Sequence, residues 1–361
     1  KGVSQMPQPV DLRSDTVTKP TQSMRDAMWK AEVGDDYYFE DPTVRKLEEI
    51  AAEKLGKEDA LFVASGTMGN LVSIFTAVRP GDVIIVETNA HIFRAERGHL
   101  GVVSGVQAKS VDGKLGVMAP EAIEDALSVF PESTAFPRVS LICLENTHNG
   151  AGGTCWSAAQ IHAVREVADR HHLKIHVDGA RIFNAAVAQK VDPRVLVGDV
   201  DSVQFCLTKG LCCPYGSLVA GKKDFIKEAR FARQMVGGGM RQAGIMAAAG
   251  IVALENMIDR LVEDHANARL LAEGLLDMGF TIDIESVQTN MVFVNAAPER
   301  TTMDGWVVAL RNRGYLMNTP SKTGRTRMVT HYGILREDIL AFLAATAEIV
   351  GVRKRASLIP A

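Results

Sequence analysis

The chain has 361 residues, more than one ordinary hydrophobic core holds, so we expect a large domain and a smaller one. Hydrophobic residues make up 47% and charged residues 23%, which is typical of globular proteins. Lysine and arginine (40) nearly balance the acidic residues (43), so nothing indicates nucleic acid or an anionic membrane as a partner. The longest apolar runs have the length of a strand, far short of the roughly 20 residues of a membrane span.

The first residues, KGVSQMPQPV, lack the apolar segment and cleavage site of a secretory signal. Five cysteines lie in apolar or strand-like segments, which is typical of reduced thiols in the cytoplasm. Two of them, Cys212 and Cys213, follow Lys209 and are interpreted as packing residues. No CxxC or HExxH spacing is present, so we expect a cytoplasmic protein without a metal site.

The first clear helix signal begins at Asp41, an expected N-cap, with Pro42 at the first helical position. Gly56 is expected to end this helix. Residues at helical spacing form its apolar face: Val44, Leu47, Ala51 and Leu55. A short strand at 59–64 follows, and the turn SGTMGN (65–70) then opens a second helix.

Strands and helices alternate through the middle of the chain. A helix is predicted over 158–172, between two of the strands. The predicted strands are short and apolar and fall at 82–87, 139–145, 174–178, 202–207 and 217–220. This alternation predicts an α/β fold with a mostly parallel sheet wrapped by helices.

The pattern changes after about residue 250. Helical periodicity over 251–279 is followed by predicted strands at 281–284 and 290–295 and a helix near 303–313. This order predicts a smaller α+β domain. The expected division is a large domain at 11–250, with an N-terminal arm at 1–20, and a small domain at 251–361.

Two strand ends carry residues suited to one cofactor. Asp178 ends the segment KIHVD, and Lys209 follows a second apolar strand about thirty residues later. A pyridoxal phosphate (PLP) enzyme requires an aspartate facing the pyridine nitrogen and a lysine that binds the aldehyde as a Schiff base. Taken alone, Asp178 is equally compatible with capping the next helix, whereas a lysine such as Lys209 must reach solvent or take part in chemistry.

Four further residues are candidates to hold acidic groups. Gly66 and Thr67 present backbone donors where a strand turns into a helix, which favours a phosphate. Arg241 follows the glycine run of MVGGGMRQ and is a second candidate contact for a phosphate or carboxylate. Arg181, three residues after Asp178, is suited to binding a carboxylate through two hydrogen bonds. The alternative for Arg241 is a surface arginine on a loop that starts a helix, and for Arg181 it is a solvated loop charge.

Two histidines follow predicted strands, at the edge where α/β folds place their sites. His91 is suited to stacking on a flat cofactor, and His148 to moving a proton near a substrate hydroxyl. A lone histidine at such a place is more often a loop residue that makes hydrogen bonds. His99, His171 and His172 are interpreted as surface or packing residues.

Several sequence blocks occur in one order between about residues 11 and 331. They are DLRSDTVTKPT, VGDDYYFEDPTVRKLE, SGTMGN, LENTHNG, HVDGARIFNA, CLTKGL with PYGSLVAG, GGGMRQAG and RMVTH. In this order they resemble the L-threonine aldolase family of fold-type I PLP enzymes. The resemblance implies a PLP-dependent transferase fold and a homotetramer of catalytic dimers. It also implies cleavage of L-threonine, L-allo-threonine and related β-hydroxy-α-amino acids to glycine and an aldehyde.

The resemblance also implies a role for each matched residue. Lys209 carries the Schiff base, Asp178 pairs with the pyridine nitrogen, and His91 stacks on the ring. The positions that match phosphate contacts are Gly66, Thr67 and Arg241. The positions that match carboxylate contacts are Ser14, Arg181 and Arg327. His148 matches the histidine near the β-hydroxyl.

The chain departs from the family pattern at two places. Phe39 stands where the family usually has a glycine, in a block that usually reads GDDVYGEDPT. Farther on, Glu96, Arg97, Gly98 and His99 stand where a glutamate is usually followed by Ala-Gly-Gly. Extra positive charge and bulk near the cofactor are expected to alter the substrate pocket or the reaction.

Three alternatives stay open on the sequence. The nearest is another PLP reaction on the same scaffold, amino-acid racemisation or β-elimination, which product analysis separates from aldol cleavage. A PLP-binding protein without catalysis would be coloured but inactive. A plain α/β interaction domain would bind no cofactor.

Overall fold

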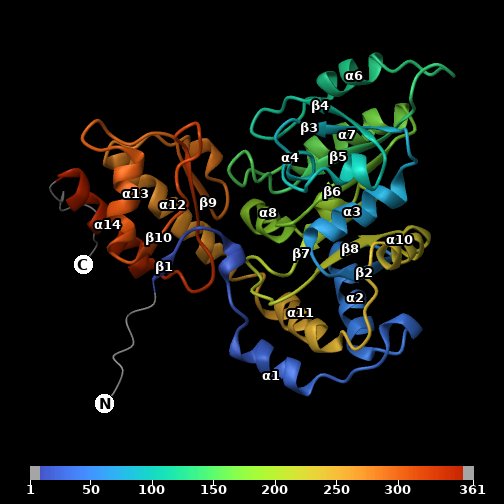
Figure 1. Cartoon of the computed structure of the whole chain (residues 1–361), viewed down its shortest axis with the longest axis horizontal. Helices are drawn as coiled ribbons and strands as arrows, with labels where there is room; N and C mark the ends of the chain where they lie inside the picture. Colours follow the sequence, from blue (N-terminus) through green and yellow to red (C-terminus); the bar gives the residue numbers. More distant parts are fainter. Residues whose placement is uncertain (1–8, 353–361) are drawn as a thin grey trace. The chain divides into compact units, whose positions relative to one another are not determined.

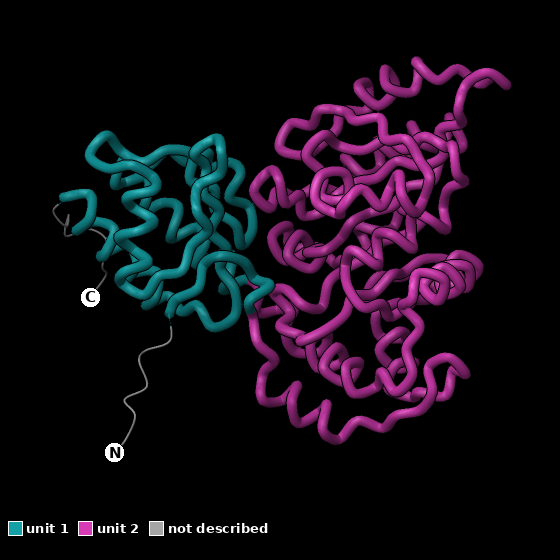
Figure 2. Tube along the Cα trace, in the orientation of Figure 1, with its two compact units in different colours: residues 1–17, 262–361 teal, residues 18–261 magenta. Residues whose placement is uncertain are grey.

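The computed structural model describes residues 9–352. The chain divides into two compact units (Figure 2). The large unit is Thr18–Leu261, and the small unit combines Lys1–Val17 with Val262–Ala361.

The large unit extends to Leu261, beyond the predicted boundary at residue 250. The reason is that α11 (Gly244–Asn256) packs against α1 (Gln22–Lys30) and α2 (Pro42–Leu55), which both belong to the large unit.

The predicted N-terminal arm, 1–20, is divided between the two units at Thr18. Its earlier part falls in the small unit, where β1 (Val10–Asp11) pairs in parallel with β10 (Tyr315–Leu316). The first part of the arm, 1–8, lies outside the described residues.

A seven-stranded sheet forms the centre of the large unit, in the order β2-β8-β7-β6-β5-β3-β4. The strands from β7 to β4 pair in parallel, whereas β8 is antiparallel to both of its neighbours. The predicted mostly parallel sheet is confirmed. The strands are β2 (Asp59–Val63), β3 (Val83–Glu87), β4 (Gln107–Val111), β5 (Val139–Glu145), β6 (Lys174–Asp178), β7 (Ser202–Cys206) and β8 (Ser217–Gly221). The sequence did not predict β4, because this edge strand (QAKSV) is polar and partly exposed.

Both faces of the sheet are buried under helices (Figure 1). In β2, Ala60 and Phe62 join the core that includes α2, whereas Leu61 and Val63 join the core formed with α3 (Gly66–Ala77). Successive side chains of a strand point to opposite faces of the sheet, and here both faces are buried. This explains why the sequence of the strand is apolar without interruption. The other helices of this unit are α4 (His91–Arg94), α5 (His99–Val102), α6 (Pro120–Ser128), α7 (Ala158–Arg170), α8 (Ile182–Gln189), α9 (Pro193–Val197) and α10 (Lys223–Met235), with a 3-10 turn, η2 (Asp36–Tyr38).

The predicted limits of α2 are confirmed. The Asp41 side chain accepts a hydrogen bond from the Val44 N–H at 2.9 Å, which caps the first turn, and Pro42 opens the helix. Gly56 ends it with a left-handed φ of 60°, the conformation that glycine adopts most readily.

One predicted helix, 251–279, is in fact two. α11 ends at Asn256 and α12 (Leu261–Asp277) begins after a short turn. The apolar periodicity continues across this turn, but the packing partners change there: α11 packs in the large unit and α12 in the small one.

The predicted strand at 281–284 is wrong. Thr281 forms only an isolated bridge with Ala296. The Asp283 side chain then accepts from the Glu285 N–H at 3.1 Å and caps the 3-10 turn η3 (Ile284–Ser286). A short acidic side chain that binds its own backbone favours a turn over a strand.

The small unit has the predicted α+β character. Its strand β9 (Met291–Val294) pairs antiparallel with β11 (Thr326–Val329). Its core surrounds Trp306 and Phe342. The remaining elements are η1 (Asp15–Val17), α13 (Met303–Arg311) and α14 (Arg336–Val350). Among residues 9–352, no helix has both the length and the apolar composition needed to cross a membrane.

Candidate active site

Asp178 lies at the carboxyl end of β6 and is almost fully buried. Its Oδ1 accepts hydrogen bonds from the Gln204 side chain (2.7 Å) and the Ala180 N–H (3.1 Å). Its Oδ2 accepts from the Asn70 side chain at 2.9 Å. Donors from α3, β7 and the turn after β6 therefore fix this carboxylate, which is more than capping the next helix requires.

Asn70 joins two carboxylates. Its Nδ2 donates to Asp178 and, at 2.9 Å, to Glu96 Oε1, while its Oδ1 accepts from His176 Nε2 at 3.2 Å. Burial lowers the pKa of His176 to about 4, so this histidine is neutral near pH 7 and its other nitrogen meets the Ser202 hydroxyl at 2.9 Å. The amide orientation of Asn70 follows from this network.

His91 begins α4, directly after β3, and its side chain is partly exposed. Its Nδ1 donates to Glu96 Oε1 at 2.8 Å, and this hydrogen bond, opposed by burial, raises the pKa of His91. The charge of Asp178 acts in the same direction. Burial opposes ionisation of Glu96, but hydrogen bonds from His91, His99 and Asn70 outweigh it and lower the pKa of Glu96 to about 2. Glu96 is thus ionised at neutral pH.

Ligand atoms of His91, Glu96 and Asp178 lie within 4.8 Å of one another, a spacing that a metal ion can use. Their oxygens, however, already accept hydrogen bonds from Asn70 and Gln204. We therefore describe these residues as a hydrogen-bonded network, and the absence of a metal site stays a prediction.

Lys209 lies in the loop after β7 and is partly buried. Its backbone carbonyl accepts from the Thr18 hydroxyl (3.0 Å) and the Cys212 N–H (2.9 Å). These contacts fix the Lys209 backbone, while its Nζ makes no hydrogen bond or ion pair among residues 9–352. Cys213 nearby is buried, which raises the pKa of its thiol and agrees with a packing role.

The first turn of α3 suits a phosphate. Within the described chain the N–H groups of Gly66 and Thr67 have no acceptor. The first N–H groups of a helix have no partner inside the helix, so they bind a ligand or water instead. A Cβ at Gly66 would lie 2.6 Å from Cys206 Sγ, so only glycine fits there. A Cβ at Gly238 would lie 2.5 Å from Met68 Sδ, which places the predicted glycine loop beside this turn.

The arginines predicted from the sequence have different surroundings. Arg181 is buried at the start of α8, so its interpretation as a solvated loop charge is wrong. Arg241 is exposed, with its guanidinium 3.3 Å from Asp35 and over the Tyr37 ring at 4.9 Å. The phosphate contact of Arg241 therefore stays a prediction.

Ser14 and Arg327 lie in the small unit and both border Arg13. The Ser14 hydroxyl accepts from the Thr16 N–H at 3.2 Å, and Arg327 donates to the Arg13 carbonyl at 3.4 Å. Their role as carboxylate contacts remains a prediction.

His148 is buried at the carboxyl end of β5 with both ring nitrogens engaged. Its Nε2 donates to Glu87 at 2.9 Å and its Nδ1 accepts from the Ala151 N–H at 3.1 Å. Burial disfavours its charge, but the carboxylates of Glu145 and Glu87 outweigh burial and raise the pKa of His148. In this arrangement the ring offers no free lone pair to a substrate hydroxyl.

Sequence reasoning missed Asn70 and Gln204 as site residues and placed His99 among surface or packing residues. His99 is buried and hydrogen-bonded to Glu96. The available signal was a polar residue inside an apolar element, such as Gln204 in the strand SVQFC, because buried polar groups require partners.

Both departures from the family pattern occur on left-handed backbone. Phe39 has a φ of 63°, and its ring lies 5.3 Å from the Arg45 guanidinium and 5.0 Å from that of Arg230. These cation–π contacts offset part of the strain at a position where the family usually has glycine. Arg97 has a φ of 57° and is exposed.

Arg97→Gly is expected to stabilise the protein by about 1 kcal/mol, because glycine removes the left-handed strain at a small cost in chain entropy. No hydrogen bond or ion pair of the Arg97 guanidinium is lost within the described residues. Urea unfolding measures the change, with Arg97→Ala as the matched control that leaves the strain in place. Equal stability of the glycine and alanine variants would contradict this account of Arg97.

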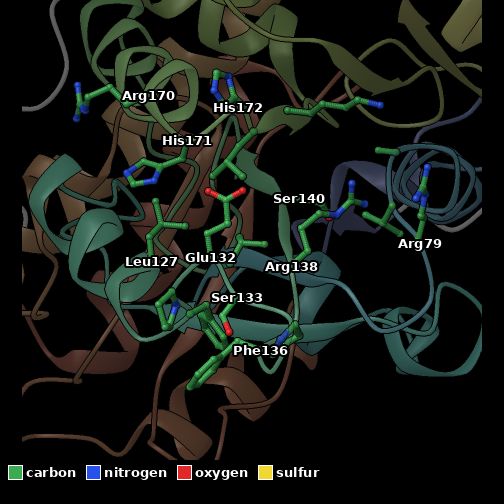
Figure 3. Close-up of a pocket in the computed structure, with 18 of the residues that line it drawn as sticks. Arg79, Leu127, Glu132, Ser133, Phe136, Arg138, Ser140, Arg170, His171 and His172 are labelled. Atoms are coloured by element: carbon green, nitrogen blue, oxygen red, sulfur yellow. The ribbon is translucent and has the colours of Figure 1, made fainter.

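A cavity of about 720 Å³ lies at the amino ends of β5 and β6 (Figure 3). Asp178 lies at the opposite end of β6. Two cationic residues of the cavity are already neutralised, Arg138 by Asp82 (2.5 Å) and Arg170 by Glu124 (2.6 Å). Its lining, in the described part of the chain, includes none of the predicted site residues, so this cavity is not the candidate active site.

The parallel sheet, with an aspartate and a lysine presented at its carboxyl edge, is the architecture of fold-type I PLP enzymes, and its structural neighbours include enzymes of this type. A family model described as beta-eliminating lyase matches residues 11–297. The chain therefore belongs to the class of PLP-dependent lyases.

The relatives narrow this class. The chain is 46% identical to low-specificity L-threonine aldolase 1 of Arabidopsis thaliana, over 91% of this chain and 93% of that protein. It is 41% identical to low specificity L-threonine aldolase of Escherichia coli strain K12, over 91% and 96%. A threonine aldolase structure from Leishmania major shares the fold, with a TM-score of 0.82 and 21% identity over 95% of this chain and all of that one. The chain belongs to the L-threonine aldolase family.

Proposed function

We propose that the protein uses PLP to cleave L-threonine, L-allo-threonine and related β-hydroxy-α-amino acids to glycine and an aldehyde. The observation that carries this proposal is the Asp178 carboxylate, which three donors hold at the sheet edge while the Lys209 amine is left without a partner in the described chain. The names of the relatives support the reaction.

The residues present fit PLP. Asp178 is a fixed carboxylate for a pyridine nitrogen, and the first N–H groups of α3 suit a phosphate. Lys209 supplies an amine for the aldehyde. When bound, PLP supplies an electron sink for the pair released as the Cα–Cβ bond breaks.

The chain's own groups then hold and move protons. Asp178, whose oxygens Asn70 and Gln204 hold in place, would keep a proton on the pyridine nitrogen of bound PLP. His91, whose Nδ1 is fixed by Glu96, would stack its ring on that of PLP. We assign the predicted carboxylate contacts to the substrate: Ser14, Arg181 and Arg327.

For the β-hydroxyl proton, His148 can act by direct contact or through a water molecule. Both of its nitrogens are engaged, with Glu87 and with the Ala151 N–H, so either route requires Nδ1 to exchange the Ala151 N–H for the hydroxyl or the water molecule. A homotetramer of catalytic dimers and a cytoplasmic location are further proposals from the resemblance.

The products test the proposed reaction. We expect the protein with PLP to release glycine and aldehyde in equal amounts from L-threonine, L-allo-threonine or L-phenylserine, because cleavage of one Cα–Cβ bond yields one of each. Both products are assayed in one reaction. A D-amino acid, or an oxo acid without glycine, would instead establish racemisation or β-elimination on this scaffold.

A further inference from the structure

One carboxylate, Glu96, lies between two histidines. Its Oε1 accepts from His91 Nδ1 at 2.8 Å and from Asn70 at 2.9 Å. Its Oε2 accepts from His99 Nε2 at 2.9 Å. The carboxylate is buried, so these hydrogen bonds take the place of water. His99 therefore contributes a donor on the side of Glu96 that faces away from His91 and Asn70.

The backbone brings His99 to this place. Gly98, with a left-handed φ of 72°, forms a tight turn after Glu96, and His99 opens α5. The His99 ring is 6% exposed, and its Nδ1 is buried without a hydrogen-bond partner in the described residues. The hydrogen bond to Glu96 is therefore the one polar contact that this ring makes among residues 9–352.

The remaining donors cannot replace His99. Asn70 already donates its two N–H groups, one to Glu96 and one to Asp178, and the oxygen of Glu96 that accepts is Oε1. Without His99, Glu96 Oε2 would have no donor in the described chain, and only the hydrogen bonds at Oε1 would oppose rotation about the Cγ–Cδ bond. Such a rotation would move Oε1 away from His91.

We propose that His99 is a positioning residue: it fixes the rotation of the Glu96 carboxylate and thereby the orientation of the His91 ring. The part of this inference that concerns PLP rests on the proposed function, because His91 is expected to stack on the cofactor. The family usually has glycine at this position, so the hydrogen bond from His99 to Glu96 is a feature of this chain's own sequence.

Two variants of similar polarity test the inference. In His99→Gln the amide nitrogen replaces imidazole Nε2 and reaches Glu96, whereas in His99→Asn it replaces Nδ1 and falls short. The first readout is the titration of His91 in ¹⁵N-histidine-labelled protein without cofactor, assigned with His91→Asn. Asp178 and Glu145 also act on His91 and are unchanged in both variants. The second readout is the dissociation constant for PLP.

We expect His99→Asn to lower the pKa of His91 towards its ordinary value and to weaken PLP binding about tenfold, the size of one lost hydrogen bond to a charged group. His99→Gln is expected to retain the wild-type titration and affinity. If both variants behave like the wild type, or both lose the effect equally, His99 is a packing residue and the inference is overturned. The titration is read without PLP, so this failure is distinct from a failure to form glycine and aldehyde.

Discussion

Lys209→Ala is expected to lower glycine formation from L-threonine by about 10⁴-fold or more, since the variant loses both the covalent attachment of the cofactor and a group able to transfer a proton at Cα. The Lys209 Nζ makes no hydrogen bond in the described chain, so its removal should leave the free energy of unfolding nearly unchanged. Steady-state rates and urea unfolding measure the two quantities.

Two controls separate the covalent role of Lys209 from its charge. Lys209→Arg keeps a cation but cannot form the bond, and it should be as inactive as the alanine variant. Lys227→Ala removes an exposed lysine on α10 and should be as active as the wild type. Substantial turnover by Lys209→Ala would remove the lysine from the mechanism.

Asp178→Asn is expected to lower turnover about 10²- to 10³-fold, because a neutral amide cannot stabilise a protonated pyridine nitrogen. In the wild type the two Asp178 oxygens accept hydrogen bonds from the side chains of Asn70 and Gln204. The substitution replaces one of these oxygens with an NH₂ group, which is itself a donor and cannot accept. One unmade buried hydrogen bond costs roughly 1–3 kcal/mol of stability. We therefore expect a folded, weakened and nearly inactive protein.

Asp82→Asn is the matched control for this stability loss. Asp82 is also buried, but it precedes β3 at the amino end and pairs with Arg138. Its amide variant should be destabilised and retain turnover per folded molecule. Equal turnover by the Asp82 and Asp178 variants would show that Asp178 acts on stability alone.

The sequence predicted the local features of the fold well, because their causes are local. The caps of α2 depend on Asp41, Pro42 and Gly56, which act on residues within one turn. The break between Asn256 and Leu261 has a different cause, because the two helices on either side of it pack against different units. Packing partners are set by the whole fold, so the apolar pattern of the sequence did not show this break.

The same distinction applies to the candidate site. Asp178 and Lys209 could be predicted because strand ends in an α/β fold meet at one edge of the sheet. The partner of Asp178, Asn70, is 108 residues away in the sequence, and Glu87 is 61 residues from His148. Such pairs follow from the order of the strands, so the network that fixes Asp178 and engages both nitrogens of His148 became visible only in the structure.

The most direct measurement of the central claim is the amount of glycine formed per L-threonine consumed at low conversion, with 2-oxobutanoate and D-allo-threonine quantified in the same sample. Aldol cleavage predicts one glycine, with an equal amount of acetaldehyde, for each L-threonine lost. Consumption of L-threonine without glycine, with 2-oxobutanoate or D-allo-threonine in its place, would contradict the claim and assign this site to elimination or racemisation.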